Sequence, residues 1–302
     1  MSLPTPLDPA PPGLAEGREL YLKREDVHEL GAFKWRGALP ALARYRDQGA
    51  AGVVTVSTGN HGAATTWAAT RLGMTATVFV PEGASRTKLA RLAELGADVC
   101  EIGADLDVAK EHAVAFAGAA GLPLFEDGAE PAQLDGYREI GEEIVDQLGV
   151  APAAVVVPVG NGALLAGVGR ALGERSAGTR RIGVVASAAP VMALSWQAGR
   201  AVACDLMATM ADGLAVRVAI PMAVEWLLED ADEMLRVSER ELARAVAAYD
   251  AAGIRAEGAA AAALAALPQV DADGPVVLLV TGCNIDADLL AGCCDDPESF
   301  PS

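Results

Sequence analysis

The sequence lacks any long uninterrupted apolar run. Its apolar stretches are broken by Gly, Pro or charged residues, so none reaches the roughly 20 residues that a membrane-spanning helix needs. The first residues, MSLPTPLDPAPPG, contain neither the basic nor the apolar segment of a secretory signal. We therefore expect a cytoplasmic protein that does not contact membranes.

Basic residues are also scarce. The chain has 23 Lys and Arg against 41 Asp and Glu, which gives a formal net charge of −18. Sequence-independent binding to nucleic acid or to anionic lipid needs a basic surface, so neither partner is expected. An anionic small molecule would have to be held by local backbone dipoles.

Cysteine is present in an odd number, five, without a C-x-x-C pair or a Cys/His cluster at metal-binding spacing. Reduced thiols are therefore the expectation, and no metal site is predicted from these residues.

What the chain does have is length and apolar character. With 302 residues, 52% of them hydrophobic, it can bury a large core and should fold as two lobes. Short, continuous apolar runs alternate with Ala- and Leu-rich helical patterns. This alternation predicts an α/β protein, rich in parallel sheets covered on both faces. The strand-like runs are 53–57, 76–81, one near 99, 155–160, 182–187 and 276–282.

The order of these runs predicts two domains. Residues 46–139 should form a small, substrate-side domain inserted between 1–45 and 140–302, which should form the large, cofactor-binding domain. In open parallel sheets, ligands bind beyond the carboxyl ends of the strands. A site in a cleft between the two domains is therefore expected.

The first candidate motif is YLKREDVHELGAFKWRGAL at 21–39. Lys34 follows Phe33 at the expected start of a helix, with Lys23 and Arg36 in the neighbourhood. Nearby positive charge and partial burial would favour a nucleophilic amine. The alternative is a solvated lysine on a helix face.

The second motif, STGNHG, lies between an expected strand and an expected helix. An amide side chain at Asn60 is able to hydrogen-bond a ligand oxygen in the cleft. The alternative is that Asn60 only caps the helix, since Asn is favoured there.

The third motif is PVGNGALLAG at 158–167, a strand end, a glycine-bearing turn and a helix start. Backbone N–H groups at such a helix N-terminus bind phosphate. Glycine-rich turns of this kind also occur for tight packing alone.

The fourth motif, TGCNID, ends the last strand-like run with Thr281. Its hydroxyl is suited to donate to a ring nitrogen, or to satisfy a local backbone carbonyl.

Taken together, the four motifs resemble the pyridoxal-phosphate enzymes of the tryptophan-synthase β fold (fold type II). The nearest likeness is to the threonine dehydratase and serine racemase family, and it extends from about residue 20 to 290. It implies pyridoxal 5'-phosphate as cofactor, a small amino acid as substrate and a homodimer.

The resemblance also implies roles for individual residues. Lys34 would carry the cofactor as a Schiff base and act as the catalytic base, and Thr58 stands where serine racemases carry a catalytic serine. The implied cofactor-binding residues are Phe33, Lys34, Asn60, Gly160, Asn161, Gly162, Ala163, Leu164 and Thr281. The implied substrate-binding residues are Ser57, Thr58, Gly59, Asn60 and His61.

The sequence departs from the family pattern at several places. Ala32 stands where the family has Ser or Thr, and the phosphate loop has GNGA in place of GGGG. The acidic residue of the family's divalent-cation site falls near Val185, so no metal is expected although Glu257 is present. The sequence stops at residue 302 without a regulatory domain, so the allosteric control of biosynthetic dehydratases is not expected.

The resemblance favours an ammonia-lyase that converts a hydroxy-amino acid such as L-threonine or L-serine to a 2-oxo acid and ammonia. A neutral hydroxyl at Thr281 leaves the cofactor ring weakly electron-withdrawing, which favours quick loss of a β-hydroxyl. The alternatives are a serine or amino-acid racemase, a β-replacement enzyme similar to threonine synthase, and a non-catalytic cofactor-binding protein.

Overall fold

The computed structural model describes residues 4–15 and 17–302; residues 1–3 and 16, which fall in the predicted large domain, lie outside it. The chain divides into two compact units. The first unit consists of Met1–Phe33 with Tyr137–Ser302, and the second of Lys34–Gly136.

The first unit contains a mixed sheet with strand order β1-β2-β9-β6-β7-β8, in which β1 pairs antiparallel to β2 and the other pairs are parallel. Its strands are β1 (Leu7–Pro9), β2 (Leu20–Arg24), β6 (Ala154–Pro158), β7 (Arg180–Ala186), β8 (Glu233–Val237) and β9 (Val276–Val280). Its helices are α1 (Pro12–Ala15), α7 (Ala163–Arg175), α8 (Val191–Ala198), α9 (Pro221–Asp230), α10 (Glu239–Ala251), α11 (Gly258–Ala265) and α12 (Ala287–Asp295).

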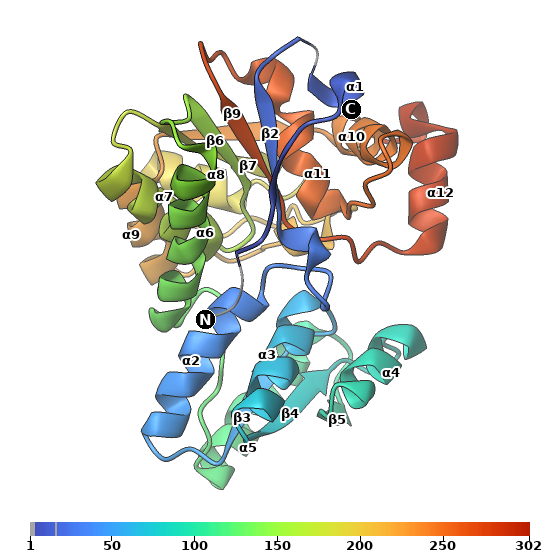
Figure 1. The fold of residues 1–302 in the computed structure, drawn as a ribbon. Coiled ribbons are helices and arrows are strands. Elements are labelled where there is room, and N and C mark those ends of the chain that lie inside the picture. Colours follow the sequence, from blue (N-terminus) through green and yellow to red (C-terminus); the bar gives the residue numbers. More distant parts are fainter. Residues whose placement is uncertain (1–3, 16) are drawn as a thin grey trace. The chain divides into compact units, whose positions relative to one another are not determined.

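The core of this unit is built on the fully buried strands β6 and β9. Figure 1 shows α7, α8 and α9 on one side of the sheet and α10 and α11 on the other. A sheet covered on both faces buries the side chains of both faces, which is why these strands are continuous apolar runs. Each fully buried Val or Leu contributes about 1.5–3 kcal/mol.

The second unit contains a parallel sheet with strand order β3-β4-β5. Val54 and Phe79 pack on α5 at one face, and Val78 and Val80 pack with Leu92 of α4 at the other. The strands are β3 (Gly52–Val56), β4 (Thr75–Val80) and β5 (Asp98–Glu101). The helices are α2 (Trp35–Asp47), α3 (Asn60–Arg71), α4 (Arg86–Glu94) and α5 (Leu106–Ala120), and α6 (Ala132–Leu148) begins here and continues in the first unit.

The α/β class and the six strand-like runs predicted from the sequence are confirmed. Three further strands, β1, β2 and β8, were not predicted. β2 contains Lys23, whose side chain is fully buried and bonds to Glu143 at 2.5 Å. Lys23 is therefore buried in an ion pair, although a lysine in the sequence is normally read as an exposed residue.

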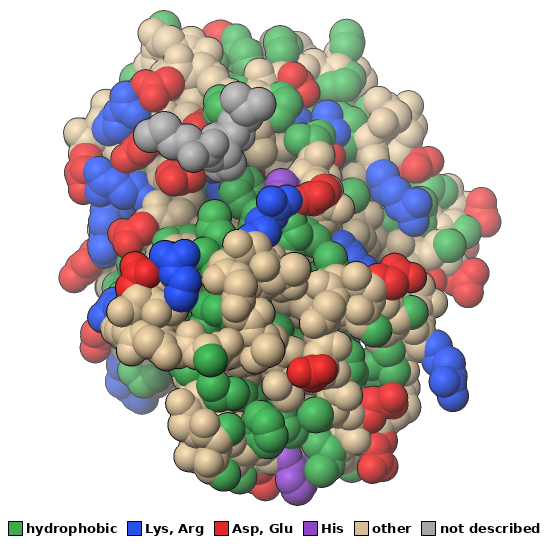
Figure 2. All heavy atoms as spheres, turned by 60° about the horizontal axis from the view of Figure 1, so that its bottom comes forward, with side chains coloured by type: hydrophobic (Ala, Val, Ile, Leu, Met, Phe, Trp, Pro, Cys, Tyr) green, Lys and Arg blue, Asp and Glu red, His purple; other side chains and the backbone are tan. Residues whose placement is uncertain are grey.

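The surface carries basic side chains that are interspersed with carboxylates, as Figure 2 shows for one face. Arg181 pairs with Asp232, and Arg244 with Glu298, each with two hydrogen bonds. Such exposed pairs contribute little to stability, about 0–1 kcal/mol each, but they neutralise positive charge locally. None of the described helices has the length and apolarity that a bilayer-spanning segment needs.

Two glycines of α7 provide a test of how tightly this helix packs. A Cβ at Gly169 would overlap the carbonyl oxygen of Asp230, the last residue of α9, whereas a Cβ at exposed Gly173 has only the end of Arg181 near it, at 3.4 Å. We expect Gly169→Ala to lower the free energy of unfolding by about 1–3 kcal/mol. Gly173→Ala should raise it by up to about 1 kcal/mol, because Ala is the better helix former. Urea unfolding of the two variants measures both, and equal effects would contradict the close contact of α7 with α9.

Candidate active site

In the first unit, two of the predicted motifs lie at the same edge of the sheet. β6 and β9 are parallel neighbours, and the loop with Gly160 follows β6 as Thr281 follows β9. Since parallel strands end at the same edge, the two motifs meet where ligands bind in sheets of this kind.

The loop after β6 requires glycine at two positions. Gly162 has φ +101°, and a Cβ there would lie 2.7 Å from Leu227 Cδ1. A Cβ at Gly160 would overlap the carbonyl oxygen of Gly213. α7 begins at Ala163 immediately after this turn, so its first-turn N–H groups and the positive end of its dipole lie at the loop.

One feature of this loop was not predicted. The Asn161 side chain accepts a hydrogen bond from the backbone N–H of Ala163 at 3.0 Å. The N–H of Ala163, the first residue of α7, therefore has an internal partner one residue before the N-cap, Gly162. The adjacent first-turn N–H groups, such as that of Leu164, remain the natural donors for an anion.

Thr281 anchors the segment that precedes Lys34. The N–H of Phe33 donates to the carbonyl of Thr281 at 3.1 Å, and Ala32 pairs with Gly282 in an antiparallel bridge. The Phe33 ring packs on Tyr137, with ring centroids 5.3 Å apart. Thr281 is 2% exposed, so the first unit brings Phe33, Thr281 and the glycine loop to one edge of its sheet.

In the second unit, the STGNHG motif forms the turn between β3 and α3. The N–H of Gly59 donates to Ser57 Oγ at 3.1 Å, and the helix begins at Asn60 with Gly59 as its N-cap. Asn60 therefore does not serve as the N-cap. Thr58 is half-buried in the turn, and His61 is buried in the first turn of the helix.

Lys34 lies immediately before α2, which confirms the predicted helix start. Its Nζ donates to Asp127 Oδ2. Positive charge was expected near Lys34, whereas in the structure its amine has a carboxylate partner, and Lys23 is engaged by Glu143. Asp127 was not predicted as a site residue. In the sequence it follows the apolar segment PLF and Glu126, a pattern that is also typical of an ordinary turn.

Asp127 and His61 have opposite electrostatic responses to burial. Burial is the largest single influence on the Asp127 carboxyl and raises its pKa, but the charge of Lys34, the nearby His61 and the hydrogen bonds from Lys34 and Gln133 together outweigh it, so the net pKa lies well below the usual range. Burial lowers the pKa of His61, with Asp127 opposing it and Lys34 adding to it. At neutral pH, Asp127 is therefore charged and His61 is neutral. The second unit thus brings Lys34 and His61, the last residue of the 57–61 turn, together around Asp127.

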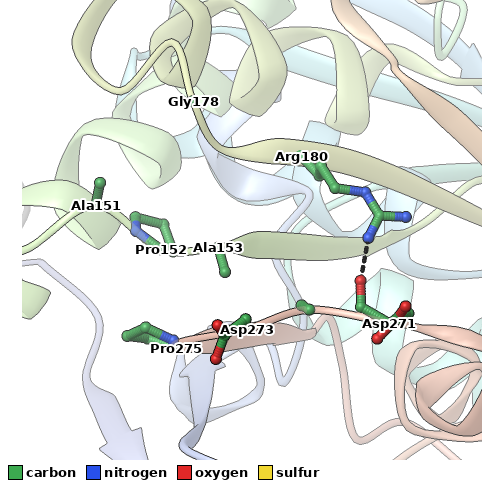
Figure 3. A pocket seen from close by; sticks show the side chains of 9 residues that line it. Ala151, Pro152, Ala153, Gly178, Arg180, Asp271, Asp273 and Pro275 are labelled. Carbon is green, nitrogen blue, oxygen red and sulfur yellow. Dashed lines mark hydrogen bonds between the residues drawn. The ribbon is translucent and has the colours of Figure 1, made fainter.

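A cavity of about 410 Å³ lies elsewhere, at the amino-terminal ends of β6, β7 and β9 (Figure 3). Arg180 lines it and donates from Nη1 to the carbonyl of Asp271. None of the predicted site residues lines this cavity. In the described ranges 4–15 and 17–302, no three His, Cys, Asp or Glu side chains are grouped so as to hold a metal ion.

Comparison with known proteins places this geometry in a family. A family model described as "Pyridoxal-phosphate dependent enzyme" matches residues 2–282. The chain is 34% identical over 275 residues to the L-threonine ammonia-lyase of Geobacter sulfurreducens, an alignment that covers 89% of this chain and 68% of that protein.

Two solved structures are similar along most of the chain. The processed form of threonine deaminase isoform 2 from Solanum lycopersicum has a TM-score of 0.91 at 29% identity, with 99% of this chain and 89% of that one covered. A fungal L-serine ammonia-lyase from Rhizomucor miehei has a TM-score of 0.87 at 25% identity, with 99% of each chain covered. The chain therefore belongs to the pyridoxal-phosphate-dependent enzymes, in the threonine dehydratase and serine racemase family of fold type II.

Proposed function

We propose that the chain is a pyridoxal-phosphate-dependent ammonia-lyase that converts a hydroxy-amino acid such as L-threonine or L-serine to a 2-oxo acid and ammonia. The observation that carries this proposal is the 34% identity to an L-threonine ammonia-lyase along 89% of the chain. The position of Lys34 before a helix and beside a carboxylate adds to it, because an amine held at a defined place is what this chemistry needs.

The residues present fit the cofactor. We assign the cofactor's phosphate to the N-terminus of α7, where a Cβ at Gly160 or Gly162 would collide with Gly213 or Leu227, so that the turn keeps its glycines, and where a helix dipole favours an anion. The Thr281 hydroxyl is suited to the pyridine nitrogen, and the Asn60 amide to the cofactor's 3'-oxygen. We assign Lys34 to the covalent bond with the cofactor, and Phe33 to the ring's surroundings.

The bound cofactor supplies the electron sink for breaking bonds at the α-carbon. The chain supplies the base: the amine of Lys34 takes the α-proton and holds it at Nζ. Backbone and side-chain donors of residues 57–61 orient the substrate carboxylate, which aligns the α-hydrogen with that amine. The β-hydroxyl leaves together with a proton as water, and the released enamine then takes up one water to give the 2-oxo acid and ammonia.

The experiment that tests this function is a scan of amino acids for 2-oxo acid release, with enantiomer exchange followed in parallel. Release of 2-oxo acid without an added nucleophile supports the lyase. Inverted amino acid would select the racemase, and neither product would favour a β-replacement enzyme or a protein without turnover.

Thr58 separates the lyase from the racemase. An ammonia-lyase needs one base, so Thr58→Ala should keep elimination from L-serine or L-threonine within about tenfold of the parent, ~1.4 kcal/mol in the barrier. A racemase needs a second acid on the far face of the α-carbon, and a β-branched threonine is restricted in the rotamers that would reach it. D-serine formed from L-serine by the parent and lost in Thr58→Ala, with elimination retained, would contradict the lyase assignment.

We further propose a cytoplasmic homodimer. None of the five cysteines, all of which lie in the described part of the chain, forms a disulfide, which fits a reducing compartment. Light scattering of the purified protein measures the oligomeric state, and a monomer mass would exclude the dimer.

A further inference from the structure

The segment that precedes the candidate lysine is held by the segment that follows β9. The N–H of Phe33 donates to the carbonyl of Thr281 at 3.1 Å, and the N–H of Cys283 donates to the carbonyl of Gly31 at 2.9 Å. The residues between these pairs form an antiparallel bridge. A short two-stranded ladder in the first unit therefore anchors the backbone that leads to the lysine.

The side chain of Asn284 completes this ladder. Its Nδ2 donates to the carbonyl of Leu30 at 2.9 Å and to that of Gly31 at 3.2 Å. A Cβ at Gly31 would lie 2.8 Å from Asn284 Oδ1, so the amide packs directly against the glycine. Gly31 has φ +61°, a conformation that favours glycine. One amide thus fixes the bend of the chain three residues before Lys34.

The ladder connects two groups of residues that we assign to the same cofactor. The loop after β6 and Thr281 belong to the first unit, whereas Lys34 is the first residue of the second unit. Phe33 and Lys34 are neighbours in the chain, so their Cα atoms are about 3.8 Å apart. Holding Phe33 against Thr281 therefore keeps the backbone of Lys34 close to a fixed point at the end of β9.

We infer that Asn284 is a positioning residue for Lys34, and that it holds this lysine in place for the capture of a cofactor whose phosphate is bound at the N-terminus of α7. The inference rests on the proposed function, in which Lys34 is the attachment residue. In capture, the nitrogen of the neutral amine attacks the aldehyde carbon of pyridoxal 5'-phosphate, and the bond that forms becomes C=N. The aldehyde oxygen leaves as water with the two hydrogens of the amine. Once the phosphate is bound, the rate of this step depends on where the amine is held.

A purely structural role would behave differently. Loss of Asn284 would then lower thermal stability, but it would change the capture of any aldehyde by Lys34 to the same extent. Pyridoxal has the same aldehyde and lacks the phosphate, so it is not anchored at the loop and gains little from a positioned amine. The ratio of the capture rates of pyridoxal 5'-phosphate and pyridoxal is therefore the informative quantity.

Both rates are measured at one pH on the full chain freed of cofactor, by the yellow absorbance that appears on capture. The protonation of the amine then enters both rates equally. We expect Asn284→Ala to lower the ratio by about 10- to 100-fold relative to the parent, since a displacement of about 1 Å costs on the order of 10²-fold in a positioned reaction. The rate with pyridoxal should change little.

Asn284→Leu provides a second measurement if the Ala variant is unfolded by circular dichroism. It keeps the side-chain volume and lacks the donors, so it should lower the ratio in the same way. Asn284 is exposed, so neither replacement leaves a cavity.

Two glycines provide a matched comparison. Gly31→Ala would direct its Cβ against Asn284 Oδ1, and it should lower the ratio as loss of the amide does. Gly199, which follows α8, has nearly the same backbone conformation, with φ +64°. Apart from its chain neighbours and the backbone of its own helix, no atom of the described part of the chain lies within 4 Å of a Cβ at Gly199. Gly199→Ala therefore introduces the same backbone strain without displacing Asn284, and should leave the ratio unchanged.

An unchanged ratio in the folded Asn284 variants, or an equal fall in Gly199→Ala, would overturn the inference. Borohydride reduction after capture, followed by peptide mapping, should place the label on Lys34, and a label on another lysine would overturn the inference together with the attachment assignment. Capture is read without turnover. Failure of the proposed function is therefore distinguishable, because it appears as capture on Lys34 with the expected ratios but without release of 2-oxo acid.

Discussion

Replacement of Lys34 by alanine is expected to abolish both the colour and the turnover of the enzyme. The variant loses the amine that bonds the cofactor and the base that takes the α-proton. General-base catalysis alone is worth about 10²–10⁴-fold, and loss of the covalent attachment adds to this. We expect 2-oxo acid release to fall by at least about 10⁴-fold, ~5.4 kcal/mol in the barrier.

Borohydride reduction of the holoenzyme, followed by peptide mapping, tests the same assignment without relying on activity. The label should be found on the peptide that contains Lys34. Lys110→Ala is a suitable control, because Lys110 also has a carboxylate partner, Glu126, and its side chain is 45% exposed. That variant should stay yellow and active. A label on Lys23, Lys88 or Lys110 would contradict the assignment.

The sequence was sufficient to predict the α/β class, because the central strands are apolar on both faces and leave a continuous pattern. β2 and β8 were missed for a physical reason. β2 buries Lys23 against Glu143, a partner 120 residues away in the sequence. β8 lies at the edge of its sheet and contains two charged residues, Glu233 and Arg236. In both strands, the charged side chains break the pattern that identifies a buried strand.

The same limit applies to the candidate site. Lys34, Asn60 and Thr281 were singled out because they stand at strand ends or helix starts, positions that local sequence patterns indicate. Asp127 could not be found this way, since its contact with Lys34 joins residues 93 positions apart. The backbone N–H groups of the glycine loop were expected to bind phosphate, but that of Ala163 donates to the Asn161 side chain, which depends on a rotamer that the sequence does not specify.

Gly162→Asp is expected to weaken the binding of pyridoxal 5'-phosphate by about 10²–10³-fold. A carboxylate at the N-terminus of α7 places like charge where we assign the phosphate. Two unit charges about 4 Å apart repel by on the order of 4 kcal/mol at an effective dielectric constant of 20, which corresponds to about 10³ in affinity. The positive φ of Gly162 and its closeness to Leu227 also strain any side chain there. The effect of the added charge must therefore be measured separately from the effect of the added side-chain volume.

Two further variants make that separation. Gly162→Ala introduces the strain without the charge, and should lower thermal stability more than cofactor affinity. Asn161→Asp introduces the charge without new bulk, because its carboxylate oxygen is able to accept from the N–H of Ala163 as the Asn161 amide does at 3.0 Å. Titration of the cofactor-free chain with pyridoxal 5'-phosphate, and in parallel with pyridoxal, which lacks the phosphate, measures each affinity. If the loop holds the phosphate, both acidic variants lose affinity for the phosphorylated ligand and little for pyridoxal. Equal losses for the two ligands, or none, would mean that the turn serves only to pack α7 against its neighbours.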